Sequence, residues 1–149
     1  MPDKSRPVVG AALVIGELER LHNWVMERDR DLELQEFGYA QVLNADWQPL
    51  VDRYKHLLAG HQGRVGIHGP FWGFDIAPHD PEIREIVRKR LMQGLDACEA
   101  LGATHMVVHS PFTTWDHNNL DGMPGQREAL FRRCHKAMDA VVKRAEDIG

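Results

Sequence analysis

Short stretches of β-strand character alternate four times with amphipathic stretches of helical length, and this alternation most restricts how the chain can fold. The strand-like stretches are residues 8–15, 31–37, 64–68 and 104–109. After each of them, apolar residues recur every three or four positions, as they do on one face of a helix. Repeated strand–helix units place strands parallel, joined by right-handed crossovers. The sequence therefore predicts an α/β fold with four βα units.

The helix between the third and fourth predicted strands has the clearest boundaries. Asp80 is suited to cap its first turn, Pro81 to occupy its first position and Gly102 to end it. The spacing predicts one buried apolar stripe, made of Ile83, Ile86, Val87, Leu91, Leu95 and Cys98. Since no linker or low-complexity tract interrupts the sequence, we expect residues 1–149 to form a single unit.

Composition argues against several classes of function. The 149 residues include 18 Lys and Arg against 22 Asp and Glu, a net charge of −4. An acidic chain without a dense basic block is a poor candidate for broad nucleic-acid binding or for an anionic membrane surface. Its apolar stretches are far shorter than the ~20 residues that cross a bilayer. Isolated cysteines and the lack of a signal-peptide pattern favour a reduced, cytoplasmic protein.

Two similar segments lie where the last two predicted strands end. Ile67-His68-Gly69-Pro70-Phe71 corresponds to Val108-His109-Ser110-Pro111-Phe112, 41 residues later. Side chains alternate between the faces of a strand, so packing the residue before each histidine under helices turns both imidazoles to the opposite face. The carboxyl ends of parallel strands are where α/β folds place ligand sites. His68 and His109 could therefore meet one metal ion, one water or one substrate hydroxyl.

Aromatic and acidic residues extend this candidate site. Trp72 and Trp115 follow the two histidines, and aromatic faces suit the C–H face of a sugar. Glu33 on the second strand shares the face of the histidines, where a buried carboxylate needs a partner such as a metal ion, an arginine or a bound hydroxyl. Structural explanations remain open as well: a histidine can satisfy backbone carbonyls, and an aromatic ring can close the mouth of the fold.

Four segments together match a known family pattern. They are Asp31-Leu32-Glu33-Leu34, Ile67 to Phe71, Glu99-Ala100-Leu101-Gly102-Ala103, and Val107 to Pro111. With them the chain resembles the N-terminal half of the xylose isomerase-like TIM-barrel superfamily, which includes sugar-phosphate isomerases and epimerases as well as apurinic-site endonucleases. A complete barrel has eight βα units in ~250 residues. The resemblance therefore implies a (β/α) TIM-barrel type of fold with four units present, a half or truncated barrel.

The resemblance also implies roles for the candidate residues. His68 and His109 would line the active site, binding metal in the endonuclease branch and mostly orienting substrate in the sugar branch. Glu33, Trp72 and Trp115 would join them in binding substrate. The complete barrel is expected to use a divalent ion (Mn, Mg, Co or Zn), and whether this half binds it alone stays open. The main metal ligands and catalytic carboxylates are expected beyond residue 149.

Three functions follow as hypotheses. The first is a sugar or sugar-phosphate isomerase or epimerase that moves a proton next to a carbonyl with metal assistance, inactive as residues 1–149 alone. The second is a metal-dependent abasic-site endonuclease, disfavoured by the net charge of −4. The third is a non-catalytic half-barrel. Its open edges would be covered by self-association or by a missing C-terminal half. The expected ligand is a small sugar or sugar phosphate, with neither nucleic acid nor membrane favoured.

Overall fold

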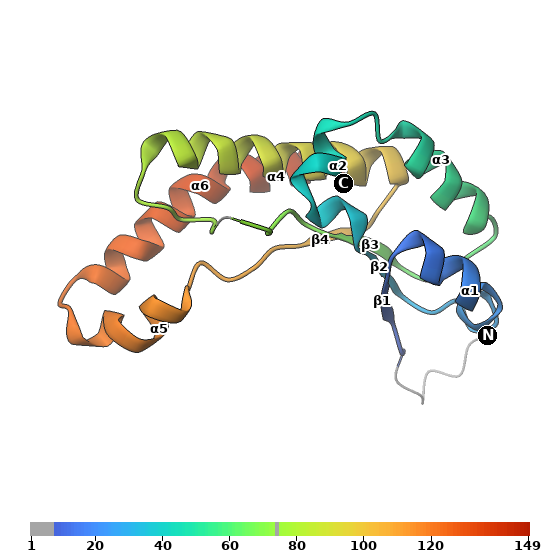
Figure 1. Cartoon of the computed structure of the whole chain (residues 1–149), viewed down its shortest axis with the longest axis horizontal. Coiled ribbons are helices and arrows are strands. Elements are labelled where there is room, and N and C mark those ends of the chain that lie inside the picture. Colours follow the sequence, from blue (N-terminus) through green and yellow to red (C-terminus); the bar gives the residue numbers. More distant parts are fainter. Residues whose placement is uncertain (1–7, 74) are drawn as a thin grey trace.

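Four parallel strands form one open sheet at the centre of the molecule (Figure 1). The computed structural model describes residues 8–73 and 75–149. The strands are β1 (Ala11–Leu13), β2 (Leu32–Leu34), β3 (Val65–His68) and β4 (His105–Val107), and they pair in the order β1-β2-β3-β4. Consecutive order and parallel direction are what successive βα units produce. The predicted α/β class is confirmed, and the open sheet is consistent with half of a barrel.

The helices follow the strands in turn, with four short elements between them that the sequence did not predict. The long helices are α1 (Ile15–Met26), α3 (Gln48–Leu57), α4 (Pro81–Leu101) and α6 (Gln126–Ile148). The unpredicted elements are the 3₁₀ turns η1 (Glu36–Gly38) and η2 (Leu120–Gly122) and the short helices α2 (Ala40–Asn44) and α5 (Thr114–Asn119). All four strands are also shorter than predicted. Within the part of the chain that is described, no helix combines the length and apolar character needed to span a membrane.

The main core lies on one face of the sheet. Leu32, Leu34 and Ile67 are at most 2% exposed and pack with apolar residues of α1, α3 and α4. Full burial of such a side chain stabilises the fold by ~1.5–3 kcal/mol. Glu33 and Gly66, which alternate with these residues along β2 and β3, lie on the opposite face. The polar face of the sheet is therefore the one that carries the candidate site.

Helix α4 has the predicted ends but only part of the predicted buried stripe. The Asp80 side chain accepts hydrogen bonds from the backbone N–H groups of Glu82 and Ile83, and Gly102 ends the helix with φ of 69°. Ile83 and Ile86, however, are 45% and 53% exposed, so their predicted burial is wrong. A helix of 21 residues is ~32 Å long, whereas a strand of four residues spans ~13 Å. The first turns of α4 therefore extend past the sheet (Figure 1).

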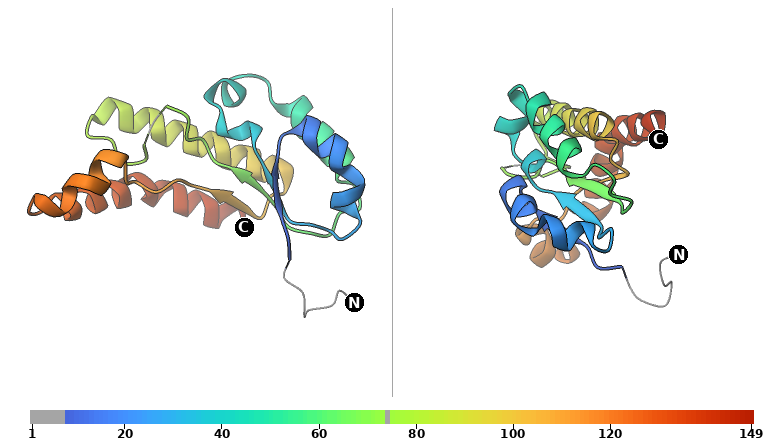
Figure 2. Two further views of the ribbon diagram at one scale, coloured as in Figure 1. Left: turned by 60° about the horizontal axis from the view of Figure 1, so that its bottom comes forward. Right: turned by 90° about the vertical axis from the view of Figure 1, so that its right-hand side faces the viewer.

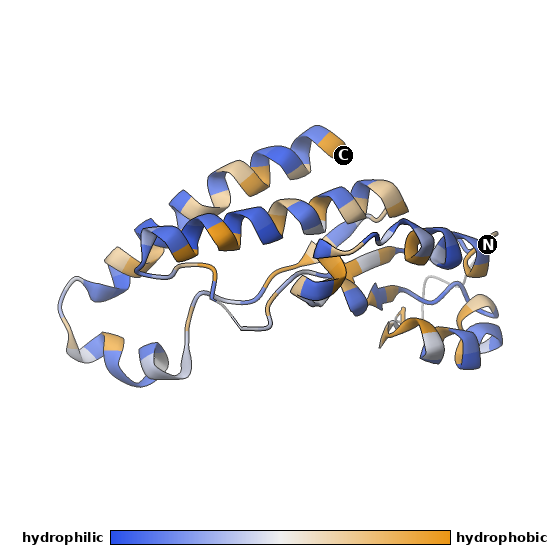
Figure 3. Cartoon of the chain, turned by 45° about the horizontal axis from the view of Figure 1, so that its top comes forward, coloured by the Kyte–Doolittle hydropathy of each residue, from blue (hydrophilic) through white to orange (hydrophobic). Residues whose placement is uncertain are grey.

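A second core joins α4 to α6, which run side by side (Figure 2). Val87, Leu91 and Leu95 of α4 pack against Val141 of α6 and the partly buried apolar residues near it. Figure 3 shows both helices with orange apolar stripes between blue polar positions, as expected of helices covered on one side only. Helix α5 lies at the end of the molecule remote from the strands (Figure 1).

The Glu36 carboxylate connects η1 to α1 and α3. Its Oε1 accepts a hydrogen bond of 2.6 Å from the backbone N–H of Ile15, at the start of α1. Its Oε2 accepts one from the hydroxyl of Tyr54 on α3. Tyr54 is fully buried; burial, reinforced by Glu36, raises the pKa of its hydroxyl well above the usual value of 10. Glu36 thereby fixes η1, the turn that leads from β2 to α2.

Candidate functional site

The loops that follow β3 and β4 leave the sheet at the same edge. The Gly69 N–H donates to the Val107 carbonyl over 2.8 Å and extends the pairing of the two strands by one residue. A Cβ added at Gly69 would lie 2.6 Å from that carbonyl oxygen, so the close approach requires glycine here. The local sequence therefore holds the residues on either side of Gly69, among them His68, close to the end of β4.

The structure brings His68 and His109 together, as the sequence predicts. Their Nε2 atoms are 3.1 Å apart, and their ring centroids are 5.0 Å apart. His68 is 9% exposed, whereas His109 is exposed at the rim. One imidazole is thus enclosed by protein and the other is open to a ligand.

The tautomer of the histidine pair follows from its hydrogen bonds. His68 Nδ1 lies 2.7 Å from the Gly69 carbonyl oxygen, which can only accept a hydrogen bond. In the neutral imidazole, Nδ1 therefore carries the proton and Nε2 has the lone pair. His109 Nε2 must then donate to His68 Nε2. A backbone carbonyl on the second nitrogen is the arrangement that orients histidine ligands in metal sites.

The separation of the two Nε2 atoms also fits a shared metal ion. Two nitrogens that each lie ~2.1 Å from one ion are ~3.4 Å apart at a tetrahedral angle and ~3.0 Å apart at a right angle. The observed 3.1 Å falls between these values. Among the residues described, no group of three or more His, Cys, Asp or Glu side chains is placed to hold an ion. The pair could therefore supply two ligands, and the remaining ones would come from water, substrate or other protein.

Aromatic side chains form one wall beside the histidines. The rings of Phe71 and Trp72 have centroids 4.6 Å apart, and Trp72 stacks on Tyr39 at 5.9 Å. Trp72 is 57% exposed and Tyr39 36% exposed, so both offer free ring surface at the rim. Tyr39 was missed by sequence reasoning. Its position just after β2, equivalent to that of the residues that follow β3, is the signal that could have identified it.

Glu33 lies on the expected face but one row below the histidines. It is level with Gly66 in the pairing of β2 with β3, and its Oε1 accepts a hydrogen bond of 2.9 Å from Gln35 Nε2. The partner that a half-buried carboxylate requires is thus the side-chain amide of Gln35, the residue directly after β2. His68 lies two residues beyond Gly66 along β3, so Glu33 is not directly beside it.

Trp115 is not brought to the histidines. It lies in the first turn of α5, which is remote from the strands, and it is 58% exposed (Figure 1). That turn is held by a capping box in which the Thr113 hydroxyl and the Asp116 carboxylate bond each other's backbone N–H groups. The loop after β4 therefore carries its tryptophan outward, whereas the loop after β3 keeps Trp72 beside the site.

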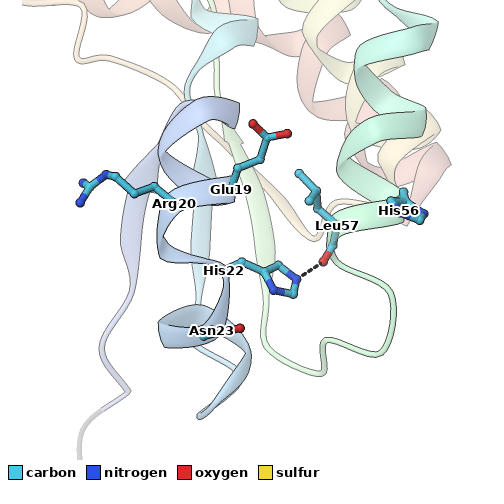
Figure 4. A pocket seen from close by; sticks show the side chains of 6 residues that line it. All are labelled: Glu19, Arg20, His22, Asn23, His56 and Leu57. Atoms are coloured by element: carbon cyan, nitrogen blue, oxygen red, sulfur yellow. Dashed lines mark hydrogen bonds between the residues drawn. The ribbon is translucent and has the colours of Figure 1, made fainter.

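Other features of the described chain lie away from this rim. A groove of about 430 Å³ runs between α1 and α3, and in it His22 Nε2 bonds the Leu57 carbonyl over 2.7 Å (Figure 4). The Nε2 atom of His22 is thus already hydrogen-bonded to the backbone. Cys98 is buried against the sheet, and burial raises the pKa of its thiol to about 12, which removes it as a nucleophile at neutral pH.

Comparison with known families identifies the fold that carries this rim. The family described as xylose isomerase-like TIM barrel matches residues 31–149. The chain belongs to this family. The match includes β2, β3 and β4, both histidines and the loops that follow them. Membership shows the fold and not a particular reaction, because the same barrel serves isomerases, epimerases and endonucleases.

One solved structure is similar to nearly the whole of this chain. The chain is similar to the TTHB071 protein from Thermus thermophilus, in a structure described as soaking with ZnCl2, at 26% sequence identity and a TM-score of 0.68. The similarity covers 96% of this chain and 53% of that protein, so the chain spans about half the length of this relative. The search of curated proteins found no match to this chain.

Proposed function

We propose that residues 1–149 supply half of the active site of a sugar or sugar-phosphate isomerase or epimerase. The observation that carries this proposal is the pair of imidazole nitrogens, 3.1 Å apart, at the carboxyl ends of two parallel strands. In a barrel this end is where active sites are built. His68 and His109 would hold a divalent ion or the oxygens of the substrate.

The residues of this half have distinct tasks in such a site. A bound divalent ion would polarise the carbonyl and hydroxyl oxygens of the sugar. His68 presents its Nε2 lone pair because the Gly69 carbonyl holds the proton on Nδ1. Trp72 and Tyr39 offer their ring faces to the C–H face of the substrate. The carboxylate that moves the proton between carbons would come from the other half of the barrel.

Metal titration of the purified chain tests this proposal. We expect Zn²⁺ or Co²⁺ to bind, and His68→Ala and His109→Ala each to weaken the affinity by about tenfold or more, since the loss of even an outer partner of a metal ligand costs that much. His56→Ala, which removes an exposed imidazole of α3, should bind like the wild type. Equal affinity in all four proteins would refute the assignment of the histidine pair.

Catalysis and substrate class need a second measurement. We expect residues 1–149 to leave a ketose unchanged in the presence of Mn²⁺ or Mg²⁺, and conversion by this chain alone would show that the site is not shared with another half. An abasic DNA duplex serves as the opposing substrate. Because the chain carries a net charge of −4, we expect no salt-dependent binding to this duplex. Tight, salt-dependent binding would instead favour the endonuclease.

A further inference from the structure

Phe71 touches both histidines of the site. Its ring centroid lies 4.3 Å from that of His68 and 4.4 Å from that of His109, and its plane is within 21° of the His109 plane. The three rings thus contact one another in pairs. Stacked aromatic contacts of this kind fix the relative orientation of the rings.

Phe71 is itself held from behind by η1. Its backbone N–H donates to the Gly38 carbonyl over 3.4 Å. A Cβ added at Gly38 would lie 3.2 Å from Phe71 Cε1, so the missing side chain of Gly38 makes room for the ring. The buried Gly38 and the two imidazoles therefore enclose Phe71 from different sides.

The two histidines depend on Phe71 to different degrees. His68 is buried and anchored by its bond to the Gly69 carbonyl. For the exposed His109, the contact with His68 Nε2 is the single side-chain hydrogen bond recorded across residues 8–73 and 75–149. One hydrogen bond leaves an imidazole free to turn about the bond axis. The stacked face of Phe71 is what selects one orientation.

The repeated sequence provides an internal comparison. Phe112 follows His109 at the spacing at which Phe71 follows His68, and both phenylalanines are half-buried. Phe112, however, packs edge-on against Phe131 at 5.6 Å and lies beneath the Arg127 guanidinium. Two residues at equivalent positions of the repeat thus have different neighbours, and only Phe71 contacts the imidazoles.

From these contacts we infer that Phe71 is a positioning residue, which holds the His109 imidazole so that its Nε2 stays beside His68 Nε2 before any ligand arrives. This inference rests on the proposed role of the two histidines. Ordering a ligand side chain in advance lowers the entropy lost on binding and so raises affinity.

Phe71→Leu tests the inference, because leucine keeps an apolar side chain but lacks the flat face. In metal-free protein labelled with ¹⁵N and ¹³C at histidine, we expect the His109 ring to become mobile on the nanosecond scale. His68 Nδ1 should keep its proton and continue to donate it to the Gly69 carbonyl oxygen. Zn²⁺ affinity should fall by about three- to tenfold, the cost of ordering one side chain on binding. Phe71→Tyr, which retains the ring, should restore both order and affinity.

Phe112→Leu is the matched control, and urea unfolding of each variant confirms that it is folded. An ordered His109 ring in Phe71→Leu, or equal effects of Phe71→Leu and Phe112→Leu, would overturn the inference. The metal-free measurement also separates this inference from the proposed function. If alanine at both histidines leaves Zn²⁺ binding intact, the function fails, while the order of the His109 ring still decides the role of Phe71.

Discussion

Replacing Tyr54 with phenylalanine should destabilise the chain strongly at neutral pH and progressively less in alkali. Tyr54 is fully buried and its hydroxyl donates to the Glu36 carboxylate, which also caps α1. Hydrogen bonds to charged groups contribute ~1.5–3 kcal/mol, so Tyr54→Phe should lower the free energy of unfolding at pH 7 by about that amount. The loss should also loosen η1, which Glu36 fixes next to the rim.

The alkaline part of this prediction follows from the raised pKa of Tyr54. Burial, followed by the hydrogen bond and the charge of Glu36, keeps this hydroxyl protonated in the folded chain far above pH 10. In the unfolded chain the same group loses its proton near pH 10. The unfolded state then binds fewer protons, so stability falls as pH rises, by up to ~1.4 kcal/mol per pH unit. The contribution of Tyr54 is complete below pH 10 and declines above it.

Urea unfolding followed by circular dichroism at pH 7, 9, 10 and 11 measures this effect. The quantity to compare is the difference in unfolding free energy between wild type and Tyr54→Phe, in which Cys98 and other alkaline groups cancel. We expect the difference to be constant up to pH 9 and to shrink by ~1 kcal/mol towards pH 11. Tyr39→Phe, at a partly exposed position, is the control. A difference that stays constant across the whole range would refute the raised pKa of the Tyr54 hydroxyl and hence its enclosure in the folded chain.

Two further predictions concern the backbone and the edges of the sheet. Gly63→Ala should lower the free energy of unfolding in urea by ~1–3 kcal/mol, because the added Cβ would lie 2.2 Å from the Asp29 carbonyl oxygen. Gly16→Ala is the control: its Cβ would meet nothing within 4 Å, so this variant should be as stable as the wild type or more stable. Because β1 and β4 each have one unpaired edge in the four-stranded sheet, sedimentation at micromolar concentration should reveal species heavier than 17.0 kDa. A monomer at every concentration would show that the open edges need no cover.

The sequence was sufficient for the parts of the fold that depend on repeated patterns. Alternation predicted four parallel strands, and the chemistry of Asp80 and Gly102 predicted both ends of α4. The phase of the strands predicted that the two histidines would meet. Each of these signals is local or periodic, so the residues themselves contain it.

The errors arise where burial depends on how far one element extends beyond another. Ile83 and Ile86 have helical spacing, yet they lie on turns of α4 that no strand reaches. Likewise, the repeat predicts equivalent places for Trp72 and Trp115, but Trp115 lies in α5, which is remote from the strands (Figure 1). A sequence repeat specifies equivalent positions along the strands and does not specify the path of the loops between them.

The contacts that hold the histidine pair lie within residues 1–149. The contacts that fix the pair come from the Gly69 carbonyl, the Phe71 ring and the pairing of β3 with β4, and Phe71 is backed by Gly38. None of these contacts crosses the open edges of the sheet. Metal binding and catalysis should therefore separate: residues 1–149 should retain the first, whereas the second should require the strands that close the barrel. Affinity for Zn²⁺ that rises only when the barrel is completed would instead place further ligands on those strands.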